Sequence, residues 1–433
     1  MPRIFAERRK AGDLDLEVVE LALRTALHAA GVAGLSELLR EPGPIPTTAP
    51  CACGSQARYK DMRLKPILTV LGPAKMLRAY YWCSHCRQRQ FPADSTRDIE
   101  DTDFSPGVRR MMALVGSECS SFEHGRQHMK LLADLEVTAK AVERVTEMIG
   151  ADIARRQQEV IQQTMQLELP VAVGQPIHKM YVQMDGTGPP MVAKETQGRS
   201  GKGEDGRAHT REAKLGCVFT QTTTDDQGRP VRDEESTTYT GAIERPPSSP
   251  AGSTRKRTSG VGVRAQVKVV MGDGADWIWN ICEEQFPGAI QIVDLYHARQ
   301  HLWDLGGQLH PSDEKSKRRW VMAHQHLLDN GKIEKLVARL RSLSPDNPEL
   351  AAAVRVEANY FEHNAEPMRY PKFRKQNLFV GSGIIEAGCK TVMGSRLKRS
   401  GMFWTVRGAN AVIALRCCRH SRHFDDYWEH RRG

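Results

Sequence analysis

Three carboxylates in this chain of 433 residues stand where acidic side chains can bind metal ions. Asp185 follows the apolar run MYVQM, and Asp273 follows the run VKVVM and one glycine. Polar groups at the carboxyl ends of strands commonly form the binding site of an α/β sheet. Glu386 lies near the start of a predicted helix, in GSGIIEAG, where Ser382 is expected to cap the helix. These residue types predict a site for Mg²⁺, which prefers oxygen ligands.

Such carboxylates can support phosphodiester chemistry. Two Mg²⁺ ions about 3.5–4 Å apart can activate a water or a 3′-hydroxyl and stabilise the leaving oxygen. Each residue alone also has a structural interpretation. Either Asp can form a turn or cap a helix, and Glu386 can pair with Lys390 one helical turn later.

Two further aspartates compete with Asp273 for the second position of the acidic set. Asp276 precedes the helical stretch WIWN and is expected to be the N-cap of that helix. Asp294 ends the next apolar run and forms a D-x-x-H unit with His297. We expect Asp294 and His297 to support the metal ligands or to position DNA, and Asp294 remains the alternative second ligand.

Four of the ten cysteines form a separate candidate metal site. Cys51 and Cys53 make a C-x-C pair, and Cys83 and Cys86 make a C-x-x-C pair 29 residues later. Four thiolates at the two ends of a β-hairpin suit a structural tetrahedral Zn²⁺, and His85 could replace one of them. The alternative is four unbound cysteines in a reducing cytosol.

The charge balance favours a polyanionic partner, because 62 Lys and Arg face 52 Asp and Glu and the pI is about 9.1. A candidate helix-turn-helix, with Thr138 as the N-cap of its second helix, would bring basic side chains to a major groove, although an ordinary helical hairpin fits equally well. Trp404 is expected to be a core residue rather than a platform for an unpaired base. The predicted DNA-contacting residues are Lys140, Arg144, Arg255, Lys256, Arg257, Lys390, Arg396, Lys398 and Arg399.

The elements that must position these groups alternate between helix and sheet. We expect helices at 14–41 and 106–165, a β unit at 51–92 around a Gly72-Pro73 turn, strands within 180–297 and charged helices over 298–376. No run of eighteen apolar residues and no signal-like core occurs, which predicts a cytoplasmic protein without a transmembrane helix. The predicted segments are 1–45 (helical), 46–98 (zinc-ribbon-like), 99–170 (helix-turn-helix-like), 171–297 (first part of the α/β core), 298–376 (helical insertion) and 377–433 (helix with Glu386 and basic tail).

Two long stretches resemble a known family. GDGADWIWNICEEQFPGAIQIVDLYHARQHLWDL and GSGIIEAGCKTVMGSRLKRSGMFWTVRGANAVIALRC are similar to the ISKra-type insertion-sequence transposases of bacteria. These belong to the Mutator-like group with an α/β ribonuclease H-like catalytic core. The resemblance covers most of the chain, from the cysteine pairs to the C-terminus.

The resemblance implies a D-D-E triad of Asp185, Asp273 and Glu386, with Asp294 and His297 as its C/D-x-x-H motif. In a ribonuclease H-like sheet the first and fourth strands are neighbours, so Asp185 and Asp273 would face one another. An all-α insertion would account for the 113 residues between Asp273 and Glu386. The family further implies two Mg²⁺ or Mn²⁺ ions, terminal inverted repeats and target DNA as partners, a dimer or larger assembly, and a place at the bacterial nucleoid.

Two other functions remain open at this point. A ribonuclease H-like nuclease would use the same acidic residues to cut DNA without joining it to a target. A non-catalytic, zinc-dependent DNA-binding protein would need only the cysteines and the basic residues, and the presence of all three carboxylates disfavours it.

Overall fold

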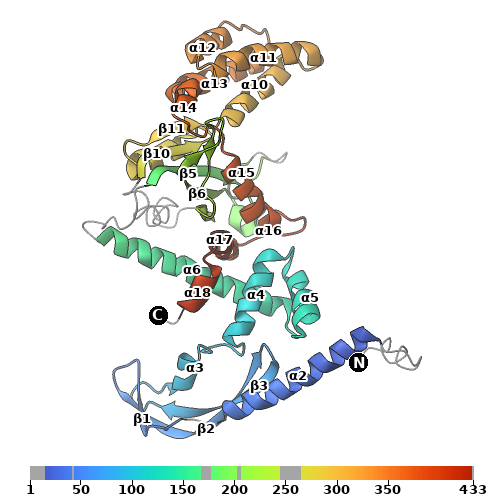
Figure 1. Cartoon of the computed structure of the whole chain (residues 1–433), viewed down its shortest axis with the longest axis vertical. Coiled ribbons are helices and arrows are strands. Elements are labelled where there is room, and N and C mark those ends of the chain that lie inside the picture. Colours follow the sequence, from blue (N-terminus) through green and yellow to red (C-terminus); the bar gives the residue numbers. More distant parts are fainter. Residues whose placement is uncertain (1–14, 41–42, 167–176, 202–205, 244–264, 432–433) are drawn as a thin grey trace. The chain divides into compact units, whose positions relative to one another are not determined.

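The computed structural model describes residues 15–40, 43–166, 177–201, 206–243 and 265–431. The chain divides into two compact units. The first contains residues 1–146 and 428–433, and the second contains residues 147–427. Figure 1 shows the elements of each unit.

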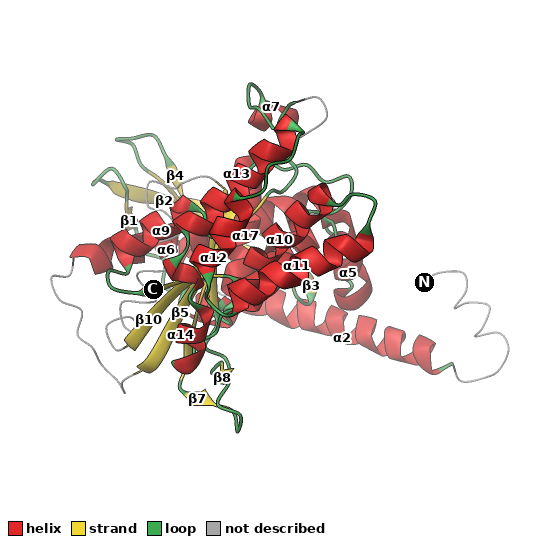
Figure 2. Ribbon diagram, turned by 90° about the horizontal axis from the view of Figure 1, so that it is seen from above, coloured by secondary structure: helices red, strands yellow, loops and turns green. Residues whose placement is uncertain are grey.

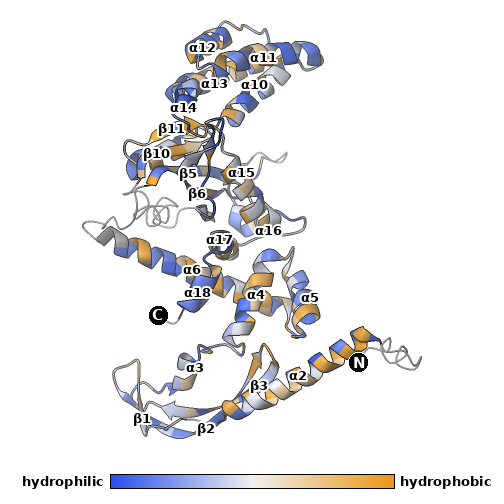
Figure 3. Ribbon diagram, viewed as in Figure 1, coloured by the Kyte–Doolittle hydropathy of each residue, from blue (hydrophilic) through white to orange (hydrophobic). Residues whose placement is uncertain are grey.

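The first unit begins with the helix α2 (Leu16–Leu38), which Asp15 caps through its side chain. The predicted helix is present, and Figure 3 shows hydrophobic residues along it. Several of its leucines are exposed, with Leu16, Leu23 and Leu27 at 65%, 59% and 70% exposure. Among the described residues, α2 is also the helix long and apolar enough to cross a membrane. Signal sequences and soluble core helices pass the same test, so the absence of a membrane span stays a prediction.

A four-stranded antiparallel sheet follows, in the order β1-β2-β3-β4, with bounds Thr48–Pro50, Gln56–Thr69, Gly72–Trp82 and Arg89–Gln90. The predicted Gly72-Pro73 turn is corrected. Thr69 pairs with Gly72, so residues 70–71 form the turn and Gly72 and Pro73 belong to β3. The remaining helices are α3 (Pro92–Thr96), α4 (Pro106–Glu118), α5 (Phe122–Ala133) and the start of α6 (Ala139–Gln166).

The second unit is built on a five-stranded mixed sheet in the order β11-β10-β5-β6-β9. The strands are β5 (Ile177–Thr187), β6 (Ala213–Gln221), β9 (Thr238–Ile243), β10 (Ala265–Gly272) and β11 (Ile290–Val293). β10 lies parallel between β5 and β11, whereas β6 pairs antiparallel with both β5 and β9. Figure 2 shows the neighbouring strands β5 and β10 of this sheet. Short elements α7 (Ala193–Thr196), β7 (Thr223–Thr224) and β8 (Pro230–Val231) lie in the connections.

Helices fill the rest of the second unit. α9 (Asp276–Gln285) joins β10 to β11, and the stretch predicted as helical contains α10 (Leu295–Leu309), α11 (Glu314–Asp329), α12 (Ile333–Arg341), α13 (Pro348–His363), η2 (Glu366–Met368) and α14 (Tyr370–Lys375). The segment with Glu386 runs through α15 (Gly383–Gly388), the π-helical η3 (Cys389–Gly394) and α16 (Ser395–Leu397). The chain then forms α17 (Val406–His420) and α18 (Phe424–Glu429).

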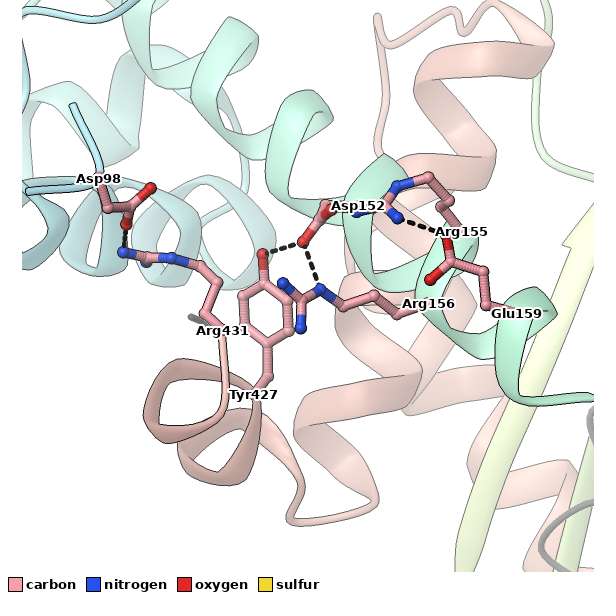
Figure 4. Close-up of polar contacts among 7 residues, drawn as sticks. All are labelled: Asp98, Asp152, Arg155, Arg156, Glu159, Tyr427 and Arg431. Atoms are coloured by element: carbon pink, nitrogen blue, oxygen red, sulfur yellow. Dashed lines mark hydrogen bonds and ion pairs between the residues drawn. The ribbon is translucent and has the colours of Figure 1, made fainter. Parts of the chain in front are cut away.

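Polar contacts hold the C-terminal helices in place within the second unit. The Asn410 side chain on α17 accepts from the Ile243 amide at 2.7 Å and donates to its carbonyl at 3.3 Å, which joins α17 to the edge strand β9. Asp152 on α6 accepts from Arg156 and from the Tyr427 hydroxyl at 3.0 and 2.8 Å (Figure 4). The helix α17 is therefore a core element, not part of a loose tail.

Candidate active site and cysteine cluster

When the strand register is extended past the paired residues, Asp185, Asp273 and Asp294 take equivalent positions on three neighbouring strands. β5 and β10 pair in parallel with Gln183 opposite Met271, an offset of 88, and the same offset separates Asp185 from Asp273. β10 and β11 pair with Gly272 opposite Val293, an offset of 21, which also separates Asp273 from Asp294. Because neighbouring strands are about 4.8 Å apart, the backbone places these carboxylates at adjacent positions at the carboxyl ends of parallel strands.

Backbone amides fix the first two carboxylates. The Asp185 carboxylate accepts from the Gly186 amide at 2.7 Å, and the Asp273 carboxylate accepts from the Ala275 amide at 2.9 Å. Both side chains are half-buried, so each carboxylate has access to solvent while its orientation is restrained. This combination suits a ligand that must receive an ion from solution.

One of the helices between β11 and α15 supports the loop after β10. The Tyr360 hydroxyl on α13 donates to the Asp273 carbonyl at 2.9 Å, and burial together with the nearby Asp273 charge raises the pKa of Tyr360. The next residue in this network, Asn364, accepts from the Trp279 indole at 3.0 Å and donates to the Tyr360 carbonyl at 3.1 Å. α13 therefore restrains the backbone that carries Asp273.

Glu386 lies on α15, and its side chain is exposed. Gln183, a fully buried residue of β5, connects this helix to the strand of Asp185. Its amide oxygen accepts from the Ile385 amide at 3.1 Å, and its amide nitrogen donates to the Gly381 carbonyl at 3.4 Å. The backbone of the α15 segment is thus held two residues away from Asp185 along β5.

A second link joins the same helical segment to Asp185. Cys389, the first residue of η3, lies close enough to Asp185 for the two side chains to interact electrostatically. Burial, followed by the Asp185 charge, raises the pKa of this thiol. The widened turn of a π-helix often marks functional positions, and here it begins three residues after Glu386.

Asp294 differs from the other two aspartates, since only 1% of it is exposed. One oxygen accepts from the His297 amide at 2.5 Å and caps α10, and the other accepts from the Ser382 amide just before α15. Both oxygens therefore serve the backbone. This favours the predicted supporting role for Asp294 over its alternative role as the second metal ligand.

The structure brings the three carboxylates into one region, but their oxygens are not close enough together to bind one ion. Among the described residues, two groups of three or more Cys, His, Asp or Glu have ligand atoms within 4.8 Å of one another, and neither group includes Asp185, Asp273 or Glu386. The Ser382 hydroxyl instead donates to the Glu386 carboxylate at 3.3 Å. The three carboxylates would have to come closer together to bind shared ions.

Three expectations from the sequence are corrected. Asp276 is the first residue of α9 and does not cap it, because the N-cap position belongs to Ala275, and the Asp276 side chain is 83% exposed. Ser382 occupies the N-cap position of α15 but makes no capping bond with its side chain. Arg396 is fully buried beside Trp404, with its guanidinium carbon 5.0 Å from the ring centroid, so it is not available to contact DNA phosphates.

The other basic candidates remain accessible where the structure describes them. Lys390, Lys398 and Arg399 are exposed near the α15–α16 segment, and Lys140 and Arg144 are exposed one turn apart on α6. Lys140 pairs with Glu143 at 2.8 Å. Thr138 is confirmed as the cap of α6, since its hydroxyl accepts from the Ala141 amide at 3.1 Å. Arg255, Lys256 and Arg257 lie outside the described residues.

Trp404 is a core residue, as expected, and its indole donates to the Leu397 carbonyl at 3.1 Å. Sequence reasoning did not single out Gln183, Tyr360 or Cys389 as parts of the site. Only Gln183 carried a usable signal, because it is the one amide in the otherwise apolar run MYVQM. A buried amide in a central strand needs a partner, and its partner is the segment that carries Glu386.

The four predicted cysteines come together in the first unit, and His85 is not part of the group. The Sγ–Sγ distances are 3.5 Å for Cys51–Cys86, 3.4 Å for Cys53–Cys51 and 3.7 Å for Cys53–Cys83. Four sulfurs bound tetrahedrally at about 2.3 Å from Zn²⁺ would be about 3.8 Å apart. The cluster therefore has a shape that could hold zinc.

Two tight turns present these thiols. The Cys51 amide bonds to the Ser55 carbonyl at 2.9 Å, and the Cys83 amide bonds to the Gln88 carbonyl at 3.0 Å. Gly54, with φ of +83°, allows the first turn to close. The Ser55 backbone amide, followed by Cys51, lowers the pKa of Cys53 to about 6, and a thiolate is the form that binds metal.

Comparison with known proteins adds little to this geometry. No family model matches the chain, and no curated protein matches it. Among solved structures, the chain is similar to one titled "Drosophila P element transposase strand transfer complex", with a TM-score of 0.24 and 10% identity over 79% of this chain and 84% of that chain. A TM-score this low does not establish a shared fold, so the functional assignment depends on the residues of this chain.

Proposed function

We propose that this protein is a metal-dependent DNA transposase of the DDE type, which cleaves DNA at the ends of its element and transfers the 3′-hydroxyl ends to a target. The observation that carries the proposal is the in-register pairing of β5 with β10, which aligns Asp185 with Asp273, beside the α15 segment tied to β5. Glu386 is the third member of the proposed triad. The ISKra-type resemblance of the sequence supports the same three residues.

The sheet supports a ribonuclease H-like core as part of this proposal. Its first strand in the chain, β5, lies beside the fourth long strand, β10, and the second long strand, β6, runs antiparallel to the first. The helices between β11 and α15 lie where the Mutator-like group would have its insertion. The contact between Tyr360 and the Asp273 carbonyl gives that insertion a role in the site.

The donor set fits Mg²⁺ or Mn²⁺, because three carboxylates offer hard oxygen ligands at solvent-accessible positions. Two such ions would supply activation of a water or 3′-hydroxyl and stabilisation of the leaving oxygen. The chain itself orients the ligands: the Gly186 and Ala275 amides restrain the aspartates, while Gln183 and Asp294 hold the backbone before and within α15. Glu386 would complete the site by rotating away from Ser382.

DNA is the proposed substrate because basic side chains lie close in sequence to the acidic site. Lys390, Lys398 and Arg399 are exposed on or just after the segment that carries Glu386, where they can neutralise phosphates. The first unit would bind the terminal inverted repeats through the zinc-supported cysteine module and through Lys140 and Arg144 on α6. Two copies or more would act together, since both ends of an element must be processed.

A cleavage assay tests the proposal directly. The substrate is a supercoiled plasmid that carries the genomic sequences flanking the gene, incubated with the full-length protein and Mg²⁺ or Mn²⁺. Asp185→Asn, Asp273→Asn and Glu386→Gln should each lower end cleavage by more than about 100-fold. Replacing a residue that only hydrogen-bonds to a metal ligand already lowers metal affinity or activity by about 10–100-fold, and these variants change the ligands themselves. Binding of the flanking DNA in a mobility-shift assay should be retained.

Asp276→Asn is the matched control, because Asp276 is an exposed aspartate three residues beyond Asp273 that has no place in the site. It should cleave as well as the wild type. Full cleavage by any of the three site variants would overturn the assignment of that residue. A joined product that contains target DNA separates a transposase from a nuclease, which would give the cut alone.

A further inference from the structure

A second group of soft metal ligands lies in the helical part of the first unit. It consists of Cys119, which follows the last residue of α4, and His124 and His128 on α5. One ligand atom from each residue lies within 4.8 Å of the other two. The two imidazoles are four residues apart on one helix, so they share a face, and the thiol approaches that face from the preceding turn.

The spacing of this group matches a coordination shell. Cys119 Sγ is 3.2 Å from His128 Nδ1, and the rings of His124 and His128 have centroids 4.3 Å apart. A sulfur at about 2.3 Å and a nitrogen at about 2.05 Å from a tetrahedral Zn²⁺ would be about 3.5 Å apart. A single hydrogen bond between Cys119 and His128 would explain the first distance but would leave the approach of His124 without a reason.

His124 is also oriented as a metal-binding histidine usually is. Its Nδ1 lies 2.9 Å from the Ser120 hydroxyl, which leaves Nε2 as the nitrogen that can bind an ion. Metal-bound histidines commonly use the second ring nitrogen for a hydrogen bond that fixes the ring. One thiolate and two imidazoles are ligands for zinc and related transition metals, and not for Mg²⁺ or Ca²⁺.

We infer that Cys119, His124 and His128 form a second zinc site, independent of the cysteine cluster, with a water molecule as the fourth ligand. The ion would join the end of α4 to the first two turns of α5, across a connection of three residues. His124 is exposed and His128 half-exposed, so the open position faces solvent. The metal would thus fix the angle between two helices that directly precede the candidate DNA-contacting face of α6.

Metal content of the untagged, full-length protein tests this inference. Protein saturated with Zn²⁺ and passed through a desalting column should contain two zinc ions per chain by mass spectrometry. Cys119→Ser and the double variant His124→Gln, His128→Gln should each contain one. With Co²⁺ in place of Zn²⁺, the four thiolates of the cysteine cluster give a charge-transfer absorbance, and the Cys119 thiolate should add to it. Both variants should lack the absorbance that Cys119 adds.

His326→Gln serves as the matched control, since His326 is an exposed helical histidine outside both groups, and it should keep two zinc ions. Circular dichroism checks that each variant is folded. The histidine variant is expected to fold because the side chains it changes are accessible to solvent. One zinc ion in the wild type, or two in the Cys119 and histidine variants, would overturn the second site. Loss of both ions in those variants would contradict its independence from the cysteine cluster. None of these results depends on whether the protein transposes DNA.

Discussion

Asp294→Asn separates the two roles that remained open for this residue. Asn keeps one oxygen, which can accept from the His297 amide, but its second group is a carboxamide NH2, which donates and cannot accept from the Ser382 amide. Ser382 is buried, and a buried donor without a partner costs about 1–3 kcal/mol. Loss of the negative charge at the start of α10 adds about 0.3–1 kcal/mol.

Removal of a buried charge offsets part of this cost, so we expect the α15 segment to lose about 2 kcal/mol, which corresponds to about 30-fold more frequent local opening. Hydrogen–deuterium exchange of metal-free protein measures it. Amides of residues 382–388 should exchange about 30-fold faster in Asp294→Asn than in the wild type. Asp313→Asn is the control, because Asp313 caps α11 in the same way, with an acceptor 3.0 Å from the Ser316 amide, but does not contact the α15 segment.

The alternative role gives a different result. If Asp294 bound the second metal ion, its replacement would raise the Mg²⁺ concentration needed for half-maximal cleavage and leave exchange in the metal-free protein unchanged. That combination would refute the supporting role. Faster exchange near α15 with an unchanged Mg²⁺ requirement would confirm it.

Three further variants or reagents address the site and the cysteine cluster. Gln183→Leu should lower cleavage about 10-fold without affecting DNA binding, because it leaves the buried Ile385 amide of the α15 segment without an acceptor. A cleavage rate within twofold of wild type would contradict this role for Gln183. Tyr360→Phe should lower cleavage several-fold in the same assay, whereas Tyr370→Phe, which removes a buried hydroxyl without a partner among the described residues, should not. In metal-stripped protein at pH 7, iodoacetamide should modify Cys53, whose pKa is lowered to about 6, before Cys86, whose pKa is raised to about 12. Peptide mass spectrometry should also show that added Zn²⁺ protects Cys53, and equal labelling with and without Zn²⁺ would argue against metal binding.

Much of the local structure could be predicted because it depends on local signals. The spacing of the four cysteines is typical of two short metal-binding turns, and the structure brings their sulfurs together. Asp273 follows β10 directly, as the sequence predicted, and Asp185 lies two residues before the last residue of β5. Their adjacency required a fold-level expectation about strand order, and the parallel pairing of β5 with β10 agrees with it.

Contacts between distant parts of the chain could not be predicted from patterns. The hydrogen bond between Gln183 and Ile385 joins residues 202 positions apart, and no pattern in either segment indicates that the two are in contact. Arg396 was expected to face DNA because it lies in a basic tail, yet its long side chain is buried beside Trp404. A basic residue type therefore does not ensure exposure, because the Trp404 ring and the Met402 sulfur surround this guanidinium in place of water. In α2 the predicted helix is present, but several of its leucines are exposed, so helical spacing alone does not show that a residue is buried.

The distance along the chain between the acidic residues bears on how the protein is made. Asp273 and Glu386 are 113 residues apart, so a ribosome that adds about 5–20 residues per second needs about 6–23 s to pass from one to the other. During that interval the nascent chain already contains the cysteine cluster, α6 and the strand-end aspartates, but lacks the Glu386 helix and the core helix α17. Under the proposed function, an unfinished chain could occupy DNA before it could cut. Chains that end before residue 381 would then act as competitors of the complete enzyme, and premature termination would restrain transposition.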